Sequence, residues 1–342
     1  MPHLTRRVWR TPRAGSLRRL TLKEENLPSL PPGHIRVQTR ACGLNFADIF
    51  ALLGLYSATP SGSFIPGLEF SGTVTETAPD ITAFRPGDRV LGITRFGGYA
   101  SIIDSPPQYC SPLPEKWSFE EGAAFPVQTL TAWYALVSLG NAQCGDWALV
   151  HSAAGGVGMR CLNICRHLGI QAIGTVRSQS KVDFLAERGQ QRIIVRGPDF
   201  PRQVRNLLGD SPLSLALDAV GGWVQKESYR LLAPTGRLIA YGAALFMPQG
   251  NRFNPLKGFF QYLNRPRYDP LKLIPDNKSV MGFNLIWLWE QAEMMSRLLD
   301  EIAAAGLDPP HVGRAFPFEQ APQAVQHLQS GESVGKVVLS EH

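Results

Sequence analysis

The pattern of hydrophobic and polar residues divides the chain into two parts. In the first part, Thr5 to about Phe125, short apolar runs alternate with turn residues, as in His34–Ala41 and in Asp88–Ile93, which follows Pro86-Gly87. This spacing is typical of short β-strands joined by tight turns. It predicts a small, mostly β, barrel-like domain.

The second part begins at Ser118-Phe-Glu-Glu121, which has the form of a helix capping box, and the composition from Ala123 to Leu139 favours a helix. Apolar runs of strand length then alternate with helix-like segments. This alternation predicts an α/β, doubly wound parallel sheet with helices on both faces. We expect strands at Ala148–His151, Ile170–Val176, Arg192–Val195, Leu213–Ala219 and Gly236–Tyr241, and helices at Gly156–Leu168, Gln179–Arg188, Phe200–Leu208 and Trp223–Leu232.

Two further segments follow the predicted sheet. Residues 246–278 are rich in proline and apolar side chains, so we interpret them as an irregular lid or oligomer contact. The stretch Phe316–Leu339 contains a predicted helix, Ala321–Gln329, and a predicted strand, Lys336–Leu339, and we expect it to return to the first domain. The chain then divides into a discontinuous domain, 1–125 with 283–342, and a second domain, 126–282.

A glycine-rich turn follows the first strand of the predicted sheet, in the run His151-Ser-Ala-Ala-Gly155-Gly156-Val-Gly158. Glycine at 155 lets the backbone approach a pyrophosphate, glycine at 158 lets the helix pack closely on the strand, and the helix N-terminus supplies N–H donors. Ala153 stands where the usual fingerprint begins with glycine, so the motif alone is weakly specific. We expect dinucleotide contacts from Ser152, Ala154, Gly155, Gly156 and Val157.

The residues after the second strand of this sheet select the cofactor. An NAD site usually places Asp or Glu there, to bond the ribose 2′-hydroxyl. This chain has Arg177-Ser178-Gln-Ser-Lys181 and no acid until Asp183. Arg177 and Lys181 would attract a 2′-phosphate and Ser178 could donate a hydrogen bond to it, so we predict NADPH. The alternative is a basic surface turn at the start of a helix.

Composition limits the class of protein. Of 342 residues, 44% are hydrophobic, enough for two buried domains, and no apolar run approaches the roughly 20 residues that span a bilayer. No signal peptide is recognisable, because arginines interrupt the N-terminal stretch. The five cysteines form no CxxC pair, which favours a reducing, cytoplasmic setting.

The net charge of +6 is concentrated at the N-terminus, where residues 1–23 hold six arginines and Lys23 but no acid. A nucleic-acid or membrane-surface patch and a mitochondrial transit peptide are two interpretations of this charge. We favour a third, a hairpin of Thr5–Arg10 and Leu17–Lys23 with a basic, solvated outer face, and do not expect nucleic acid as a partner.

A series of motifs occurs in order along the whole chain: Ala41-Cys-Gly-Leu-Asn-Phe-Ala-Asp48, Gly54-Leu-Tyr56, Pro66-Gly-Leu-Glu69, Gly87-Asp-Arg-Val90, Gly97-Gly-Tyr-Ala100, Gln128-Thr-Leu-Thr-Ala-Trp-Tyr134, Asp218-Ala-Val-Gly-Gly222 and Gly335-Lys-Val-Val-Leu339. With the glycine-rich turn, this series resembles the medium-chain dehydrogenase/reductase superfamily, and within it the zinc-less, zeta-crystallin-like quinone oxidoreductases. The aromatic stretch with Asn284 and the 246–278 insertion are similar to the vesicle amine transport protein homologues of that branch. The resemblance implies a GroES-like catalytic domain and a Rossmann nucleotide-binding domain.

The resemblance also allows a test for zinc. Zinc-dependent members place a cysteine ligand in Gly-x-Cys-x-x-Asp and a histidine in Gly-His-Glu, and this chain has Asn45 and Leu68 at those positions. An amide and an alkyl chain cannot replace a thiolate and an imidazole as Zn²⁺ ligands. The four-cysteine structural zinc lobe is missing as well, so we predict that no metal binds.

Without a metal, the resemblance implies hydride transfer from NADPH to a quinone or an α,β-unsaturated carbonyl. We expect Asn45 beside the nicotinamide and the substrate carbonyl, as a donor that stabilises developing negative charge. The alternative for Asn45 is a turn-capping role. Tyr56 either closes the substrate pocket and donates a hydrogen bond or packs as an aromatic residue.

The resemblance implies further cofactor contacts, and two acids with a different role. Glu69 and Asp48 are expected to be buried and hydrogen-bonded without transferring protons, and His151 to be a satisfied structural histidine. The other expected contacts with the cofactor come from Thr129, Val220, Gly242, Phe283, Asn284, Lys336 and from Arg196, which stands where many relatives have a tyrosine. The alternative for Lys336 is a surface lysine without a cofactor contact.

Three functions remain open at this point. The leading one is a zinc-independent NADPH-dependent quinone or enone reductase, expected to be a homodimer. The second is an enoyl-thioester reductase of a polyketide- or fatty-acid-like pathway. The third is a non-catalytic, NADPH-binding, crystallin-like protein that binds RNA, for which the basic N-terminal segment gives some support.

Overall fold

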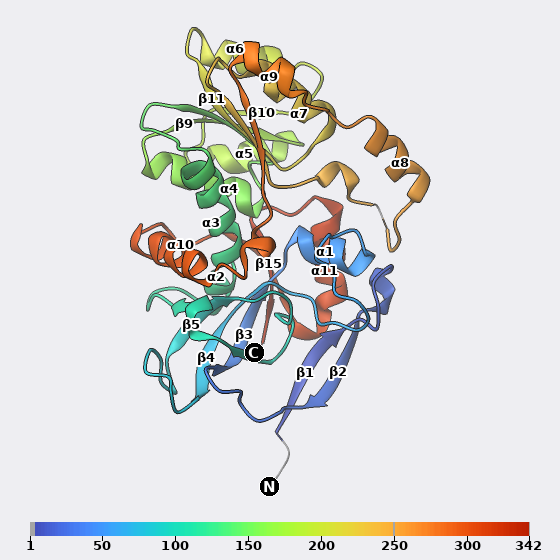
Figure 1. Ribbon diagram of the computed structural model, residues 1–342, viewed down its shortest axis with the longest axis vertical. Helices are drawn as coiled ribbons and strands as arrows, with labels where there is room; N and C mark the ends of the chain where they lie inside the picture. Colours follow the sequence, from blue (N-terminus) through green and yellow to red (C-terminus); the bar gives the residue numbers. More distant parts are fainter. Residues whose placement is uncertain (1–3, 249, 342) are drawn as a thin grey trace. The chain divides into compact units, whose positions relative to one another are not determined.

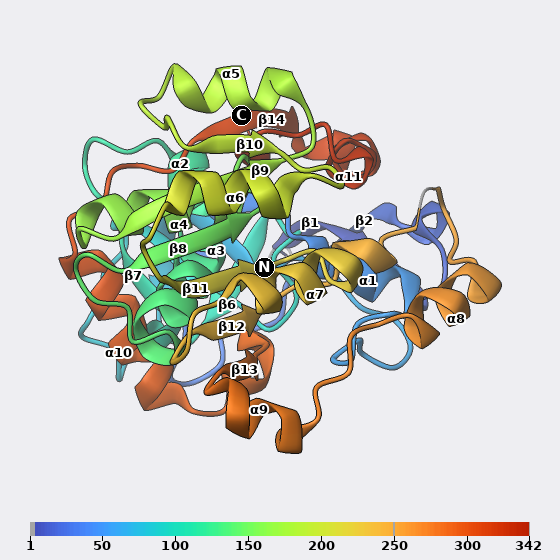
Figure 2. The same cartoon turned by 90° about the horizontal axis from the view of Figure 1, so that it is seen from above.

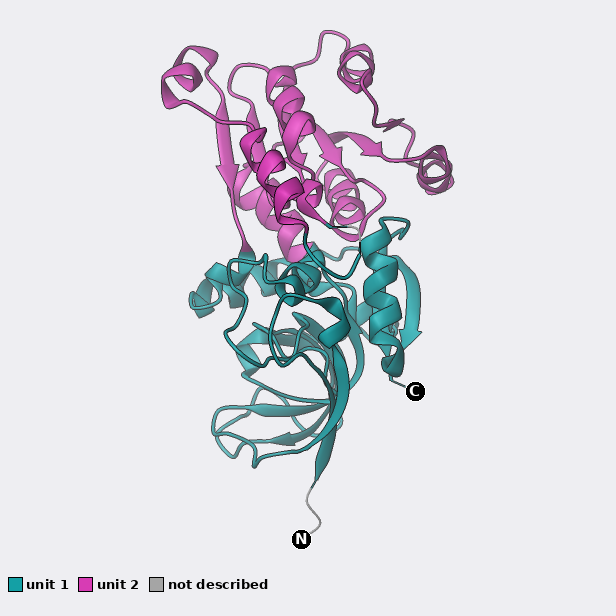
Figure 3. Ribbon diagram, turned by 90° about the vertical axis from the view of Figure 1, so that its right-hand side faces the viewer, with its two compact units in different colours: residues 1–128, 248–253, 285–342 teal, residues 129–247, 254–284 magenta. Residues whose placement is uncertain are grey.

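The structure is a computed structural model that describes residues 4–248 and 250–341 (Figure 1). The chain groups into two compact units, coloured separately in Figure 3. Unit 1 comprises Met1–Gln128, Pro248–Phe253 and Leu285–His342, and unit 2 comprises Thr129–Met247 and Asn254–Asn284. The division falls inside helix α3 (Pro126–Trp133).

Unit 1 is built on a sheet with the strand order β14-β15-β3-β4-β5-β7, in which β6 also pairs with β3. Strand β15 is parallel to β14 and antiparallel to β3, so it joins the two parts of the sheet. A separate antiparallel hairpin is formed by β1 and β2. The strands are β1 (Thr5–Arg10), β2 (Thr21–Asn26), β3 (Ile35–Gly43), β4 (Glu69–Thr77), β5 (Arg89–Ile93), β6 (Ile102–Ser105), β7 (Cys110–Pro112), β14 (Val312–Pro317) and β15 (Lys336–Ser340).

Helices connect the strands of unit 1. The first of them starts after Asn45, whose backbone is extended, and ends at Gly54, whose φ of 74° lies in the left-handed region that glycine adopts without a penalty. The helices are α1 (Phe46–Leu53), α2 (Phe119–Ala123), α10 (Ala292–Ala304) and α11 (Ala321–Ser330), with 3₁₀ turns at Leu17–Arg19, Pro107–Tyr109, Leu285–Leu288 and Phe318–Gln320.

Unit 2 is built on a parallel sheet with the order β10-β9-β8-β11-β12-β13 and helices on both faces (Figure 2). Its central strands are continuous apolar runs, as a sheet covered on both faces requires. The strands are β8 (Trp147–His151), β9 (Gln171–Val176), β10 (Ile193–Val195), β11 (Leu213–Asp218), β12 (Arg237–Ala240) and β13 (Ser279–Gly282). The helices are α4 (Gly156–His167), α5 (Gln179–Ala186), α6 (Phe200–Leu208), α7 (Gly222–Leu231), α8 (Pro255–Leu263) and α9 (Pro270–Asp276), with a π-helical segment at Tyr134–Leu139 and a 3₁₀ turn at Ala244–Phe246.

The alternation of strands and helices predicted for residues 148–241 is confirmed, with bounds that differ by up to two residues. The prediction of an irregular 246–278 segment is wrong. It contains α8 and α9, which begin with Pro255 and Pro270 directly after the capping residues Asn254 and Asp269. Proline is favoured in the first helical turn, so these prolines start helices. Strands β13 and β14 and helix α10 were not predicted.

The segment 248–253 was expected to lie with the nucleotide-binding domain, but it groups with unit 1. The amide of Leu17 donates to the carbonyl of Asn251, and the side-chain amide of Gln329 donates to the carbonyls of Pro248 and Gly250. These backbone contacts attach the segment to unit 1. Their partners lie far away in the sequence, so its local composition could not reveal them.

The basic N-terminal segment forms the predicted hairpin, with its second strand starting later than expected, at Thr21. Arg6 and Arg10 both pair with Glu25, at 2.8 and 2.7 Å, and Arg7 pairs with Glu319 and Glu341. Acids beyond the segment therefore pair with three of its seven cations, which weakens the interpretation of the segment as a nucleic-acid patch. Within the described residues, we find no helix with both the length and the apolar character that crossing a membrane requires.

Candidate functional site

A buried polar cluster surrounds Asn45 in unit 1. The Asn45 Nδ2 donates to Glu69 Oε1 at 2.8 Å, and the Lys336 Nζ donates to Asn45 Oδ1 at 2.7 Å. The same ammonium lies 2.5 Å from Glu69 Oε1, and the Lys336 and Glu69 side chains are 5% and 0% exposed. Glu69 Oε2 accepts from the amide of Val127 at 2.8 Å. Each charge of this cluster therefore has an opposite charge or a hydrogen bond beside it.

The neighbours of Asn45 fix the orientation of its side-chain amide. A lysine ammonium has only donors and a carboxylate only acceptors, so Oδ1 must face Lys336 and Nδ2 must face Glu69. One of the two Nδ2 hydrogens is used in this way. Asn45 thus stands at the capping position of α1, which agrees with one of its two predicted roles, and its role as a donor to a substrate stays a prediction.

A second carboxylate, Asp48, supports this arrangement from the first turn of α1. Its side chain is buried and accepts hydrogen bonds from the Asn45 amide at 2.7 Å, the Tyr99 hydroxyl at 3.0 Å and the Gly67 amide at 3.2 Å. Burial raises the pKa of Asp48 to about 7, although the hydrogen bonds from Asn45 and Tyr99 and the Lys336 charge act in the opposite direction. The burial and hydrogen bonding expected of Asp48 and Glu69 are confirmed.

The positions compared with zinc ligands are occupied differently. Leu68 is buried, and Asn45 faces the ammonium of Lys336. A lysine cation therefore lies against Asn45 and Glu69. Among residues 4–248 and 250–341, no group of three or more histidine, cysteine, aspartate or glutamate side chains is arranged to hold a metal.

The glycine-rich turn of unit 2 connects β8 to α4. Gly155 is the residue before α4, and a Cβ on Gly158 would lie 2.3 Å from the Ser152 carbonyl oxygen, so glycine is required there for packing. Ser152 has a positive φ of 55°, which bends the chain into the turn. The first backbone N–H groups of a helix have no partner inside it, so the residues from Gly156 onward present donors to an anion. Such a turn fits a pyrophosphate.

Two arginines lie near each other where β9 and β10 end. Arg177 follows β9, and the amide of Arg196 donates to the carbonyl of Val176 at 2.7 Å. Burial and the Arg177 charge lower the pKa of Arg196, which the Asp218 charge opposes. Like charges held together favour an anion between them, so the predicted 2′-phosphate fits here. Ser178 lies beside them at the start of α5, where its hydroxyl contacts that of Ser180 at 2.9 Å, and Lys181 is half-buried in the first turn of α5.

A chain of hydrogen bonds connects Arg196 to buried polar side chains of unit 2. Its guanidinium donates to Thr175 Oγ1 at 3.5 Å, and this hydroxyl lies 2.7 Å from His151 Nδ1. His151 Nε2 lies 2.7 Å from Ser228 Oγ, which itself donates to the carbonyl of Val224. Since the Ser228 proton is used there, His151 Nε2 is the donor and Nδ1 the acceptor. Burial, with Arg196 as a smaller cause, lowers the pKa of His151 to about 3, so the imidazole is neutral and structural, as expected.

The structure places the other expected cofactor residues in unit 2. Thr129 is fully buried in α3, and its Oγ1 has no partner among the described residues. The Asp218 carboxylate accepts from the amides of Val220 and Gly221, which shapes the turn after β11, and a Cβ on Gly242 would approach the Ala219 carbonyl oxygen to 3.0 Å. Phe283 follows β13 and makes an edge contact with Tyr134, and Asn284 is next to it.

Two expected residues lie in unit 1. Tyr56 is half-buried after α1, and its carbonyl accepts from Thr59. Lys336 was expected at a cofactor phosphate, but the structure gives its ammonium to Glu69 and Asn45. The buried ammonium of Lys336 depends on a carboxylate, Glu69, that lies 267 positions earlier in the chain. No local pattern around Lys336 indicates this partner. Tyr99, the partner of Asp48, was also missed, although it lies in the Gly97-Gly-Tyr-Ala100 motif.

Family models match both parts of the chain. The model for the Alcohol dehydrogenase GroES-like domain matches residues 31–115, and the model named Zinc-binding dehydrogenase matches residues 190–339. The human Synaptic vesicle membrane protein VAT-1 homolog is 32% identical over 326 residues, which cover 93% of this chain and 82% of the human protein. The chain belongs to the medium-chain dehydrogenase/reductase family. Unit 1 is its GroES-like domain and unit 2 its Rossmann-like domain, so the fold and the family inferred from the sequence are confirmed.

Other relatives point to different activities within the family. The zebrafish VAT-1 homolog is 32% identical over 319 residues, and this chain spans 65% of its length. A quinone oxidoreductase from Thermus thermophilus, with structures that include a complex with NADPH, is 28% identical, has a TM-score of 0.77, and covers 98% of this chain and 99% of its own. A Pikromycin polyketide synthase component of Streptomyces venezuelae is 37% identical over 236 residues, 67% of this chain and 6% of that protein.

Proposed function

We propose that the chain is a zinc-independent, NADPH-dependent reductase that acts on a quinone or an α,β-unsaturated carbonyl. The observation that carries the proposal is the Asn45 cluster, in which Glu69 and Lys336 hold an amide donor at the position of a metal ligand. The family supplies the class, oxidoreductase, and the cluster supplies the reason for the zinc-free chemistry.

Several features of unit 2 support NADPH as the cofactor. The glycine-rich turn and the start of α4 would hold the pyrophosphate, and Arg177 and Arg196 the 2′-phosphate, with Ser178 and Lys181 beside them. When bound, NADPH supplies a hydride from its nicotinamide C4. The similarity to a quinone oxidoreductase that was crystallised with NADPH supports this assignment.

The proposed role of Asn45 is to donate its second Nδ2 hydrogen to the substrate carbonyl oxygen. Negative charge grows on that oxygen when hydride arrives at the conjugated carbon, and a fixed donor stabilises it without reorganisation. Lys336 is a positioning residue in this proposal, because its positive charge on Oδ1 polarises the amide and strengthens the N–H donor. The carboxylates of Asp48 and Glu69 are engaged in hydrogen bonds, so we assign the final proton to solvent.

A screen of NADPH oxidation over quinones, enones and enoyl-thioesters tests the proposal. We expect turnover with a quinone or an enone, and a much lower Kd for NADPH than for NADH in a tryptophan-quenching titration. Equal affinity for the two cofactors would contradict the assignment of Arg177 and Arg196. Absence of turnover throughout the panel, with tight NADPH binding, would favour a non-catalytic role.

An enoyl-thioester reductase is the second candidate, and the similarity to a polyketide synthase component favours it. The two candidates share the hydride chemistry and differ in the acceptor. A kcat/KM for crotonyl-thioesters well above that for simple quinones would select the second.

We also propose a homodimer. Strand β13 is at the edge of the parallel sheet of unit 2 and is only partly buried, so its free backbone groups could pair with those of a second copy. Sedimentation analysis of the purified chain would test this, and a monomer at micromolar concentration would contradict it.

A further inference from the structure

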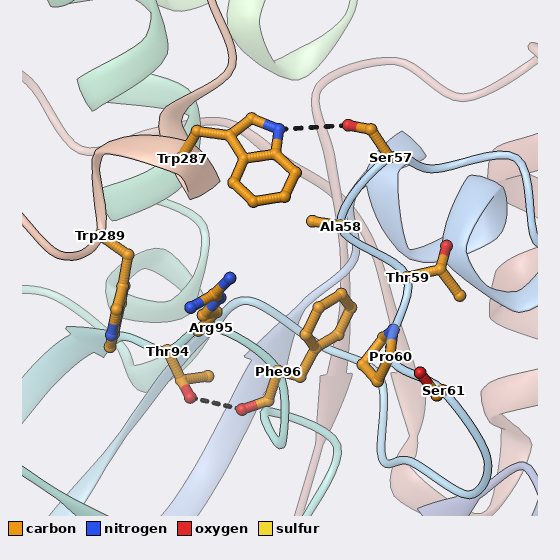
Figure 4. Close-up of a pocket in the computed structure, with 10 residues that line it drawn as sticks. All are labelled: Ser57, Ala58, Thr59, Pro60, Ser61, Thr94, Arg95, Phe96, Trp287 and Trp289. Atoms are coloured by element: carbon orange, nitrogen blue, oxygen red, sulfur yellow. Dashed lines mark hydrogen bonds between the residues drawn. The ribbon is translucent and has the colours of Figure 1, made fainter.

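A pocket opens in unit 1 beside the loops that follow α1 and β5 (Figure 4). Its volume of about 560 Å³ is in the range of small-molecule sites. Aromatic rings, small hydroxyl side chains and a single arginine line it. The lining residues are Ser57, Ala58, Thr59, Pro60, Ser61, Thr94, Arg95, Phe96, Trp287 and Trp289.

The rings of the pocket are held in place. The Trp287 indole N–H donates to Ser57 Oγ at 3.2 Å, and Trp289 stacks on Tyr109 with ring centroids 3.9 Å apart. Phe96 has a φ of 154°, unusual for a residue with a side chain, and its carbonyl accepts from the Thr94 hydroxyl at 2.5 Å. Backbone strain of this kind persists at binding sites. Fixed rings with 53% of Trp287 exposed offer a flat apolar surface for a planar ligand.

Arg95 provides the charge of the pocket. Its guanidinium lies 5.9 Å from the Trp287 ring centroid and 3.3 Å from Glu290 Oε1. The two side chains of this ion pair are 40% and 84% exposed, so the pair is weak and a ligand anion can replace Glu290 at little cost. An arginine above an exposed ring is suited to a planar molecule that carries a negative group.

The pocket is built on the same turns as the Asn45 cluster. The amide of Thr94 donates to the carbonyl of Leu68 at 2.9 Å, and the amide of the preceding residue, Gly67, donates to Asp48. Asp48 in turn accepts from the amide of Asn45. The loop that carries Arg95 and Phe96 is therefore attached, through short hydrogen-bonded steps, to the proposed catalytic donor.

We propose that this pocket selects conjugated acceptors that carry an anionic group, with the conjugated part against Trp287 and Phe96 and the anion on Arg95. This inference rests on the proposed reductase function and names its substrate class. The shared chemistry is an anion near a planar electrophile. It could be a carboxylate on the acceptor itself or a phosphate on the arm of a thioester.

Pairs of acceptors that differ in the anionic group measure its contribution to binding apart from that of the conjugated part. We compare 4-phenylbut-3-en-2-one with its para-carboxylate, and the crotonyl thioester of coenzyme A with that of N-acetylcysteamine, in the wild type and in Arg95→Gln. We expect the KM of the charged member to rise about fivefold to tenfold in Arg95→Gln, as for loss of a partly exposed charged hydrogen bond, and the KM of the neutral member to change less than twofold. The pair with the larger change identifies the source of the anion.

Arg85→Gln is the control, because Arg85 is an 88% exposed arginine of the same unit that does not line the pocket. It should leave all four KM values unchanged. Equal KM changes for charged and neutral acceptors in Arg95→Gln, or no change for either, would overturn the proposal.

A binding titration makes the inference independent of turnover. Quenching of tryptophan fluorescence by 2-naphthoate and by its neutral methyl ester reports occupancy beside Trp287. We expect Arg95→Gln to weaken binding of the naphthoate and leave binding of the ester unchanged. If no acceptor is reduced but this pattern holds, the proposed function fails and the anion pocket stands. If neither probe binds the wild type, the pocket inference fails.

Discussion

Two polar clusters of the molecule are built on opposite principles. In unit 1, Asn45, Glu69 and Lys336 form a set of complementary donors, acceptors and charges that is almost complete by itself. In unit 2, Arg177 and Arg196 place like charges near each other, and burial with this repulsion lowers the pKa of Arg196. A complementary cluster stabilises its own geometry before any ligand arrives. A cluster of like charges gains its stability when an anion binds.

The difference suits the two clusters to the different tasks that we propose for them. A catalytic donor is effective when it is oriented before the substrate binds. The free-energy cost of desolvating Glu69 and Lys336 therefore arises when the chain folds and not when the substrate binds. A selective cofactor site is effective when the wrong cofactor leaves it unsatisfied. NADH lacks the 2′-phosphate, so it would leave both arginines without their anion.

Breaking the complementary cluster should produce the largest effect. Replacing Glu69 with alanine leaves the Lys336 ammonium buried without its carboxylate, and we expect the free energy of unfolding to fall by about 3–5 kcal/mol. Urea denaturation followed by far-UV circular dichroism measures this loss. The double variant Glu69→Gln with Lys336→Met, which removes both charges, should recover much of it.

A control for this comparison is Glu187→Ala, which removes a 77% exposed carboxylate 3.8 Å from Arg188. Exposed pairs contribute little, so the unfolding free energy should change by less than about 0.5 kcal/mol. Similar losses for Glu69→Ala and Glu187→Ala would show that the buried cluster does not contribute to the stability of unit 1.

Removing the donor itself is the next test. Asn45→Ala deletes the amide but keeps both buried charges, and we expect kcat to fall about 10²- to 10³-fold, with a much smaller change in the Kd for NADPH. Steady-state kinetics on the best acceptor of the screen measures it. The exposed Asn264, whose side chain donates to the carbonyl of Phe260, offers Asn264→Ala as a control with unchanged kcat. Full activity of Asn45→Ala would remove Asn45 from the mechanism.

Substitutions in the cluster of like charges should change the affinity for the cofactor. Arg177→Gln and Arg196→Gln should each raise the Kd for NADPH about 10- to 100-fold, since a charge-assisted hydrogen bond contributes about 1.5–3 kcal/mol, and leave the Kd for NADH nearly unchanged. Isothermal titration calorimetry with both cofactors tests the expectation. Arg205→Gln, on α6, is the matched control. A parallel loss of NADPH and NADH affinity would mean that the arginines do not bind the 2′-phosphate.

The smallest expected effect is on the pH dependence of stability. One buried group of each unit contributes to it, and the two contributions change with pH in opposite directions. The pKa of Asp48 is raised from 3.8 to about 7, so its contribution to stability is complete below pH 3.8 and is lost as the pH rises toward 7. The pKa of His151 is lowered from 6.5 to about 3, so its contribution is complete above pH 6.5 and is lost as the pH falls toward 3. Between pH 3.8 and 6.5 the two slopes have opposite signs, each up to about 1.4 kcal/mol per pH unit.

Single substitutions should separate these slopes. Relative to the wild type, His151→Gln should make the unfolding free energy fall more steeply with rising pH over this interval, and Asp48→Asn should make it rise. Urea midpoints measured at several pH values give both differences. If the pH profiles of the two variants run parallel to that of the wild type, neither group titrates as described.

The sequence was informative where structure depends on local pattern. The run from β8 to α4 could be predicted because its apolar strand, glycine turn and helix are consecutive in the chain. Strands β13 and β14 were missed because they are short and partly exposed and show no clean alternation, whereas α10 was missed although its buried Met295, Leu298, Leu299 and Ile302 follow a helical spacing. The prolines of residues 246–278 were taken as breakers, although Pro255 and Pro270 occupy the position where proline starts a helix.

In the candidate sites, too, only the residues that depend on local pattern could be predicted. Arg177, Ser178 and the glycine-rich turn were identified because they directly follow strands. The partners of Asn45 and Arg196 were not identified, because tertiary contacts bring Glu69 and Lys336 to Asn45, and Thr175 to Arg196. Hydrogen bonds between residues 291 positions apart, such as that from Lys336 to Asn45, are visible only in three dimensions.

That separation in sequence also has a consequence for folding during synthesis on the ribosome. At about 5–20 residues per second, on the order of 15–60 seconds pass between the synthesis of Asn45 and that of Lys336, 291 positions later. During this time Glu69 lacks its cation and β3 lacks β15, and the whole of unit 2 is made before Lys336 is added. The nascent GroES-like unit would then present an unpaired strand edge, which is the kind of surface that chaperones engage.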